Sequence, residues 1–254
     1  MQQVFVEDAA VRENTVTITG EDARHLAGVV RIKNGEKVRI STQGGESFLG
    51  TVILASKDEV VCEITERSLA DTELKGEILL FQALPKGDRL DFIVQKVVEL
   101  GASAVYPVTM DYCITKWESS KISKKVSRYQ AIAEAAAKQS KRSRLPVFES
   151  PVNFREALSI AKERCDVLLL PYENEKGMAG TLETIEKIKP ESKVAIFIGP
   201  EGGFSEKEIE LAKGEAEFLS LGRRILRTDT AAILAVGYVM MKMEAEMETD
   251  HDLS

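Results

Sequence analysis

The chain has 254 residues, of which 44% are hydrophobic and 30% are charged, and its formal net charge is −7. This composition is typical of a soluble globular protein of one or two domains, and no apolar run approaches the roughly 18–20 residues of a membrane span. The acidic balance argues weakly against nucleic acid as a partner, and the odd number of widely spaced cysteines (Cys62, Cys113 and Cys165) favours free thiols in the reducing cytoplasm.

The first 66 residues alternate apolar and polar side chains, which is the spacing of half-buried strands. Glycine-containing turns at 34–35 and 44–45 separate these strands, and one short helix fits residues 21–30. We therefore predict a small β-barrel over residues 1–70, with a linker at 68–76. The strands are expected at 15–19, 37–41, 48–54 and 60–65.

The pattern changes after the linker, because apolar strand candidates now alternate with segments of helical spacing. The helix expected at 90–100 ends before Gly101, a residue type that suits a helix C-terminus. Such alternation is typical of a mostly parallel α/β sheet covered on both faces, which predicts a second domain over residues 71–254. Its strands are expected at 78–84, 104–108, 166–170, 194–198 and 217–221, and its other helices at 121–139, from 205, and at 231–246.

Basic residues gather between Lys116 and Arg144, where nine Lys or Arg stand against two acidic residues. Trp117 and Tyr129 lie among these charges. Basic side chains with interspersed aromatic rings suit phosphate contacts and base stacking. A solvated helix face would have the same composition, so nucleic-acid binding and simple solvation both stay open for this segment.

Two glycine-bearing turns carry the functional interpretation. The first, Ile198-Gly-Pro-Glu-Gly-Gly-Phe-Ser205, lies between an apolar strand and a charged helix, and the second is Leu221-Gly-Arg-Arg-Ile-Leu-Arg-Thr-Asp-Thr-Ala-Ala232. Two such turns at strand ends in one α/β region indicate a pocket for a small molecule, although each glycine alone is also ordinary turn chemistry. The first turn lacks the Lys-Ser/Thr of a P-loop, and the chain has no Gly-x-Gly-x-x-Gly.

Metal and hydrolase chemistry are not expected. The chain has two histidines, His25 and His251, and neither lies near a pair of cysteines that would complete a zinc site. It also has no Gly-x-Ser-x-Gly nucleophile elbow. We therefore predict no metal site.

Four ordered segments resemble one family, the bacterial 16S ribosomal RNA uridine N(3)-methyltransferases of the SPOUT class. The segment that begins at His25 also resembles the PUA-like domain of that family, so the likeness covers nearly the whole chain. The four segments are Lys86–Gly101, Gln139–Pro146, Ile198–Ser205 and Leu221–Ala232.

This resemblance implies an α/β trefoil knot in the C-terminal domain, with S-adenosyl-L-methionine held in a bent shape. It implies a homodimer with the active site at the subunit interface. The implied substrate is a uridine in the decoding region of 16S rRNA, presented on the assembled small ribosomal subunit and methylated at ring atom N3.

The resemblance also implies the cofactor contacts. S-adenosylmethionine carries no phosphate, so the missing P-loop lysine fits this ligand. Apolar side chains would hold the adenine, and glycines would let the backbone approach it closely. The expected cofactor-binding residues are Leu170, Pro171, Ile198, Gly199, Pro200, Glu201, Gly202, Gly203, Leu221, Gly222, Ile225, Leu226, Thr230 and Ala231.

Methylation of N3 requires the uracil anion, because the ring N–H is mostly protonated at neutral pH. Arg227 is expected to stabilise that negative charge, and Glu201 or Asp229 to take the proton. The alternatives are a helix N-terminal charge for Glu201 and an N-cap of the last helix for Asp229. RNA contacts are expected from Arg31, Lys33, Lys124, Lys125, Arg142 and Arg144.

The chain departs from the family pattern at three places. Asp111-Tyr-Cys113 stands where Glu-Arg-Ser is expected, Asp229 stands where Glu is commoner, and Gln2-Gln3 replaces an Arg near the start. Two other functions stay open. One is a SPOUT enzyme that methylates another RNA position or the ribose, and the other is a non-catalytic RNA-binding protein that keeps the fold.

Overall fold

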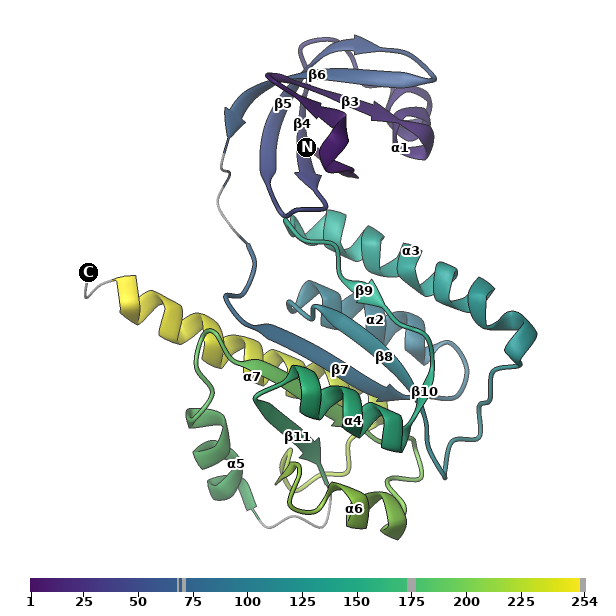
Figure 1. Cartoon of the computed structure of the whole chain (residues 1–254), viewed down its shortest axis with the longest axis vertical. Coiled ribbons are helices and arrows are strands. Elements are labelled where there is room, and N and C mark those ends of the chain that lie inside the picture. Colours follow the sequence, from purple (N-terminus) through teal and green to yellow (C-terminus); the bar gives the residue numbers. More distant parts are fainter. Residues whose placement is uncertain (68, 70–71, 173–176, 252–254) are drawn as a thin grey trace. The chain divides into compact units, whose positions relative to one another are not determined.

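The computed structural model describes residues 1–67, 69, 72–172 and 177–251, and they form two compact units (Figure 1). The first unit contains residues 1–73 together with 137–145, and the second contains 74–136 and 146–254. Residues 68, 70 and 71 of the predicted linker lie outside the described residues. The segment 137–145 thus packs with a unit that is distant from it in sequence.

The first unit is a six-stranded half-barrel with the strand order β1-β4-β5-β6-β3-β2. The predicted strands and the helix, α1 (Gly20–Arg24) continuing as η2 (His25–Val30), are present. Sequence reasoning missed β1 because its Gln-Gln start breaks the apolar alternation, yet β1 pairs in parallel with β4 and Gln3 is buried. The strands are β1 (Gln2–Val6), β2 (Val11–Arg12), β3 (Thr15–Thr19), β4 (Lys37–Thr42), β5 (Ser47–Ala55) and β6 (Glu59–Arg67).

The second unit is built on a parallel sheet with the order β10-β8-β7-β12-β11-β13, and β9 pairs with β8. This confirms the predicted α/β class with a parallel sheet. Its central strands are continuous apolar runs because both faces of the sheet are covered. The strands are β7 (Glu77–Ala83), β8 (Ala104–Thr109), β9 (Val147–Phe148), β10 (Val152–Asn153), β11 (Val167–Pro171), β12 (Lys193–Ile198) and β13 (Glu217–Leu219).

Helices cover this sheet, and α7 packs against α2 and against strands β7 and β12. None of the described helices is long and apolar enough to span a membrane. Sequence reasoning missed α4, whose start is fixed by a capping box between Asn153 and Glu156. The helices are α2 (Arg89–Glu99), α3 (Ile122–Ser140), α4 (Phe154–Arg164), α5 (Gly177–Glu186), α6 (Glu206–Ala212) and α7 (Thr228–His251).

Aromatic rings fill the core beneath the carboxyl ends of the central strands. Phe81 stacks between Tyr106 and Phe197, with both pairs of ring centroids 4.7 Å apart. Phe154 meets Phe197 edge-on at 5.8 Å. Fully burying a phenylalanine side chain stabilises a fold by about 1.5–3 kcal/mol, so this stack gives the strand ends a firm base.

The last part of the chain returns to the middle of the sheet. After the edge strand β13, residues 220–227 lead back to α7, which begins at Thr228 beside the ends of β7 and β12.

Candidate functional site

A cavity of about 520 Å³ lies at the carboxyl ends of β11 and β12. The loop after β12 and the loop between β13 and α7 both line it, so the two glycine-bearing turns share one cavity as predicted. Its lining residues are Pro171, Tyr172, Ile198, Gly199, Pro200, Glu201, Gly202, Gly203, Phe204, Ser220, Leu221, Gly222, Arg223, Arg224, Ile225, Leu226, Arg227, Thr228 and Ala231.

The first loop is tight because its glycines meet neighbouring side chains. A Cβ at Gly199 would come 3.1 Å from the Phe204 ring, and a Cβ at Gly202 would come 3.0 Å from the Cβ of Tyr112. Gly203 has a φ of +73°, and its N–H donates to the Pro200 carbonyl at 2.9 Å. Glycine at 199 and 202 therefore leaves room for the Phe204 ring and the Tyr112 side chain.

The second loop is anchored to α5 by Ser220. The Ser220 N–H donates to Thr181 Oγ1 at 2.9 Å, and that hydroxyl donates to the Ser220 carbonyl at 3.0 Å. The Ser220 hydroxyl also accepts from the Gly222 N–H at 3.3 Å, and Gly222 has a φ of +102°. These contacts fix the start of the loop.

Thr228 connects the two loops, and sequence reasoning missed it. Its buried hydroxyl donates to the Gly199 carbonyl at 2.9 Å and accepts from Gln82 Nε2 at 2.9 Å. The ends of β7 and β12 are thereby tied to the first residue of α7. A threonine at the start of a long helix, after a glycine-bearing turn, is the sequence signal that could have indicated this role.

All predicted cofactor residues except Leu170 and Thr230 line the cavity. Leu170 is fully buried inside the sheet, and the next residue, Pro171, contributes to the cavity instead, because successive strand residues face opposite sides. Thr230 is exposed on the first turn of α7. The lining residues that the sequence-based list omitted are Tyr172, Phe204, Ser220, Arg223, Arg224 and Thr228.

Glu201 forms an ion pair with Arg89 and accepts the backbone N–H of Lys86 at 3.1 Å. Burial alone would raise the pKa of the Glu201 carboxyl, but the hydrogen bond from Lys86, with the further help of Arg89, brings the pKa below its ordinary value. Such a carboxylate is a weak proton acceptor at neutral pH. Its contacts attach the first loop to the segment after β7 and to the start of α2, a role that none of the three predicted functions of Glu201 described.

Arg227 is exposed and lines the cavity, and its carbonyl accepts the N–H of Ala231 at 2.8 Å. The last helix begins at Thr228, so Asp229 lies in its first turn and does not cap it. The Asp229 carboxylate accepts the Thr230 N–H at 2.9 Å and does not line the cavity. Of the two catalytic residues predicted in this segment, Arg227 lines the cavity and Asp229 does not.

Apolar residues are exposed beside the cavity and along α7. Ile225 is 87% exposed, Leu234 is 45% exposed and Met241 is 65% exposed. Leu234 and Met241 are seven residues apart and therefore lie on one face of the helix. Ile225 was predicted to help form the adenine slot, and it lines the cavity but is largely open to solvent.

The predicted basic residues differ in their surroundings. Lys124 is exposed, whereas the ammonium of Lys125 lies 4.8 Å from the centre of the Trp117 ring. That ring stacks on Tyr129 with centroids 5.6 Å apart. In the first unit, Arg31 and Lys33 are exposed.

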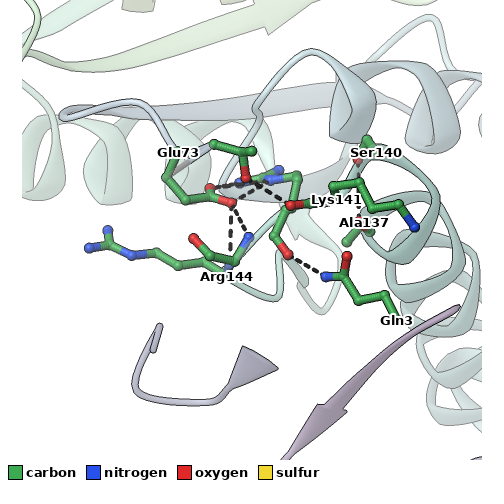
Figure 2. A network of polar contacts seen from close by, with 9 residues as sticks. Gln3, Glu73, Ala137, Ser140, Lys141 and Arg144 are labelled. Atoms are coloured by element: carbon green, nitrogen blue, oxygen red, sulfur yellow. Dashed lines mark hydrogen bonds and ion pairs between the residues drawn. The ribbon is translucent and has the colours of Figure 1, made fainter. Parts of the chain in front are cut away.

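Arg142 is a correction to the predicted RNA contacts, because it is buried with 4% exposure and pairs with Glu73. Figure 2 shows Glu73 facing the segment that leads to Arg144, and Gln3 reaching the same segment from the other side. Glu73 accepts the Ser143 N–H at 2.9 Å and the Arg144 N–H at 3.2 Å. Arg144 itself is exposed and stays a candidate RNA contact.

Gln3 belongs to the same buried network. Its side-chain amide donates to the Arg142 carbonyl at 2.6 Å, so this residue faces the interior of the first unit and not an RNA phosphate. Of the two glutamines that stand in place of the expected arginine, Gln3 thus makes an internal contact, whereas Gln2 is exposed.

Two family models match the chain. Residues 72–240 match the model described as an RNA methyltransferase domain, and residues 18–65 match the model described as an RNA methyltransferase PUA domain. The first match covers the second unit from the end of the linker into α7 and includes every residue that lines the cavity.

Relatives match nearly the whole chain. The Ribosomal RNA small subunit methyltransferase E of Bacillus subtilis is 32% identical, over 96% of this chain and 98% of its own length. The Neisseria gonorrhoeae protein of that name, solved bound to S-adenosyl methionine, has a TM-score of 0.81 at 28% identity, covering 95% of this chain and 97% of its own. A putative methyltransferase from Legionella pneumophila, also solved with bound cofactor, has the same TM-score and identity, over 94% and 96%.

Proposed function

The chain belongs to the RNA methyltransferase family whose members include the ribosomal RNA small subunit methyltransferases E, and we propose that it transfers a methyl group from S-adenosylmethionine to N3 of a uridine in 16S rRNA. The observation that carries this proposal is that the two glycine-bearing loops line the same cavity. The bound cofactor of the two solved relatives supports the choice of methyl donor.

The residues around the cavity suit this cofactor. The volume of the cavity lies within the roughly 300–1,000 Å³ of typical small-molecule sites. Ile198, Leu221 and Leu226 offer an apolar surface for adenine, and loop backbone groups offer donors and acceptors for its edge. Arg223 and Arg224 offer cations for the carboxylate of the amino-acid end. When bound, the cofactor supplies an activated methyl group.

The chain's own residues must make N3 of uracil nucleophilic. We propose that the Arg227 guanidinium faces the uracil oxygens and stabilises the anion, which lowers the pKa of the imide so that water can take its proton. Glu201 is a poor base because hydrogen bonds lower its pKa. Asp229 lies outside the cavity lining, so it is the weaker of the two earlier candidates for direct proton transfer.

RNA binding is proposed for exposed basic residues in both units. Arg31, Lys33 and Arg144 would give the first unit its RNA-binding role, and Lys124 with Lys125 would provide phosphate contacts along α3. Lys125 is half-buried, and its ammonium is in cation–π contact with the Trp117 ring. The proposed substrate is 16S rRNA within the assembled small subunit, which places the reaction in the cytoplasm.

A homodimer is proposed from the exposed apolar face of α7. Leu234 and Met241 on that face, with Ile225 at the cavity mouth, would be covered by a second copy of the chain. Covering Ile225 in this way would also complete the cavity wall. The dimer predicts that the cofactor affinity falls when Leu234 or Met241 is replaced by a charged residue.

The decisive experiment incubates purified small ribosomal subunits from a strain lacking the gene with the protein and S-adenosylmethionine, and maps the rRNA by mass spectrometry. One new methyl group on a uracil base is expected. Because a methyl at N3 blocks the Watson–Crick edge, reverse transcription should stop at the same nucleotide. A methyl group on another base or on a ribose would support the alternative of a SPOUT enzyme that methylates another RNA position. A protein that neither binds S-adenosylmethionine nor methylates the subunit would support the non-catalytic alternative.

A further inference from the structure

An exposed aromatic ring stands beside the cavity. Tyr112 is 52% exposed and follows β8, whose carboxyl end lies next to that of β7. No hydrogen bond or ring contact joins its side chain to any other residue that the structure describes. An unpaired aromatic ring at the ligand-binding end of a parallel sheet has the position of a substrate contact.

The turn that carries Tyr112 is held on both sides. The Asp111 N–H donates to Glu208 Oε1 at 2.9 Å, and the Ser205 hydroxyl donates to Asp111 Oδ2 at 2.7 Å. Cys113 is buried, and its N–H closes the turn onto the Met110 carbonyl at 3.1 Å. The ring is therefore exposed on a fixed backbone, and its exposure does not reflect a loose segment.

The ring also lies next to the wall of the cofactor cavity. Gly202 lines the cavity, and a Cβ at that position would come 3.0 Å from the Cβ and 3.5 Å from the Cγ of Tyr112. The segment that carries Tyr112 continues to Thr115, whose hydroxyl donates to the Pro85 carbonyl at 2.9 Å. Tyr112 thus sits where the loops after β7, β8 and β12 meet.

A base that is methylated on its ring must leave its stack, which costs the nucleotide its stacking partners. An aromatic side chain can replace them, and RNA-binding proteins use exposed aromatic rings in this way. We propose that the Tyr112 ring is the stacking platform that holds the target pyrimidine beside the methyl donor. This inference rests on the proposed function, since it names a residue that positions its substrate.

The test replaces Tyr112 by Leu, which keeps the Cβ against Gly202 but removes the aromatic face, and by Phe, which keeps the face and removes the hydroxyl. Tyr112→Leu is expected to lower kcat/KM for the ribosomal substrate roughly 10- to 100-fold, whereas Tyr112→Phe stays within about threefold of wild type. Cofactor affinity by calorimetry should be unchanged in both. Phe92→Leu, which alters an aromatic ring of similar exposure (48%) on α2, is the matched control and should leave kcat/KM unchanged.

Three results would overturn the inference. They are a Tyr112→Leu enzyme as active as wild type, a Tyr112→Phe loss as large as that of Leu, or a Tyr112→Leu protein that loses dimer mass in light scattering. The first removes any role for the ring, the second assigns the effect to the hydroxyl, and the third makes the ring a subunit contact. Failure of the proposed function is distinct, because the wild-type protein would then bind cofactor without methylating the subunit.

Discussion

The Thr228 hydroxyl lies 2.9 Å from the carbonyl oxygen of Gly199 and donates a hydrogen bond to it. These residues are 29 positions apart and belong to the two loops that close the cavity. The same hydroxyl accepts from Gln82. The ends of strands β7 and β12 are therefore both hydrogen-bonded to the first residue of α7. The loops therefore keep their relative position without depending on the ligand alone.

Replacing Thr228 by Val should weaken both the fold and cofactor binding. The substitution conserves shape but removes the hydrogen bond to the Gly199 carbonyl, which costs about 1–3 kcal/mol for a buried polar group, and it leaves the Gln82 amide with its other hydrogen bond, to the Ala83 carbonyl at 2.9 Å. Urea denaturation and calorimetric titration with S-adenosylmethionine would measure the two effects. Thr228→Ser keeps the hydroxyl and should retain most of the affinity. A Val variant with wild-type affinity would show that the loops are held by other contacts.

Glu201 should contribute to cofactor affinity through Arg89 and should not act as the catalytic base. Glu201→Gln and Arg89→Met are each expected to lower cofactor affinity, and the double variant should lose little more, because both remove one contact. Since the pKa of Glu201 is lowered on folding, its stabilising effect is present above the ordinary value of 4.5 and is lost as pH falls through the lower folded value. A neutral-range shift of the pH–rate profile in Glu201→Gln would instead identify it as the base.

The meeting of the two glycine-bearing turns could be predicted because each follows an apolar strand, and the carboxyl ends of parallel strands lie along one edge of a sheet. The burial of Arg142 could not be predicted in the same way. Its partner Glu73 is 69 residues away in a segment with linker composition, and a basic run gives no sign of which cation is paired. Thr228 was missed because its role depends on a carbonyl from the other loop.

Arg227→Ala should reduce the methylation rate more than cofactor affinity. The guanidinium lines the cavity but is exposed, and its proposed work is to stabilise charge that develops on uracil in the transition state. Loss of one such donor typically costs about 100- to 1,000-fold in kcat. Single-turnover rates at saturating cofactor, beside calorimetric affinities, would separate the two effects. Equal losses in rate and affinity would reduce Arg227 to a cofactor ligand, and Arg227→Lys tests whether charge alone suffices.

Reversing the charge at Lys124 and Lys125 together should weaken RNA binding and flatten its salt dependence. Each lost phosphate contact should reduce the slope of log K against log salt by about 0.7–0.9. Filter binding of rRNA fragments from 50 to 300 mM salt, over which the Debye length falls by roughly a factor of 2.4, would measure the slope. Lys162 and Lys213, exposed on α4 and after α6, offer a charge-matched control. An unchanged slope would make the α3 lysines a solvated helix face.

Glu73→Gln should destabilise the first unit selectively. The variant removes the carboxylate charge from the buried pair between Glu73 and the Arg142 guanidinium, and breaking a buried ion pair from one side costs about 3–5 kcal/mol. The single tryptophan, Trp117, lies in the second unit, so its fluorescence reports that unit, while far-UV circular dichroism reports both. Urea titration should therefore show an earlier dichroism transition with an unchanged fluorescence midpoint. Glu66→Gln, an exposed change in β6, should shift neither signal. If Glu73→Gln also shifts neither, the buried pair adds nothing to the stability of the first unit.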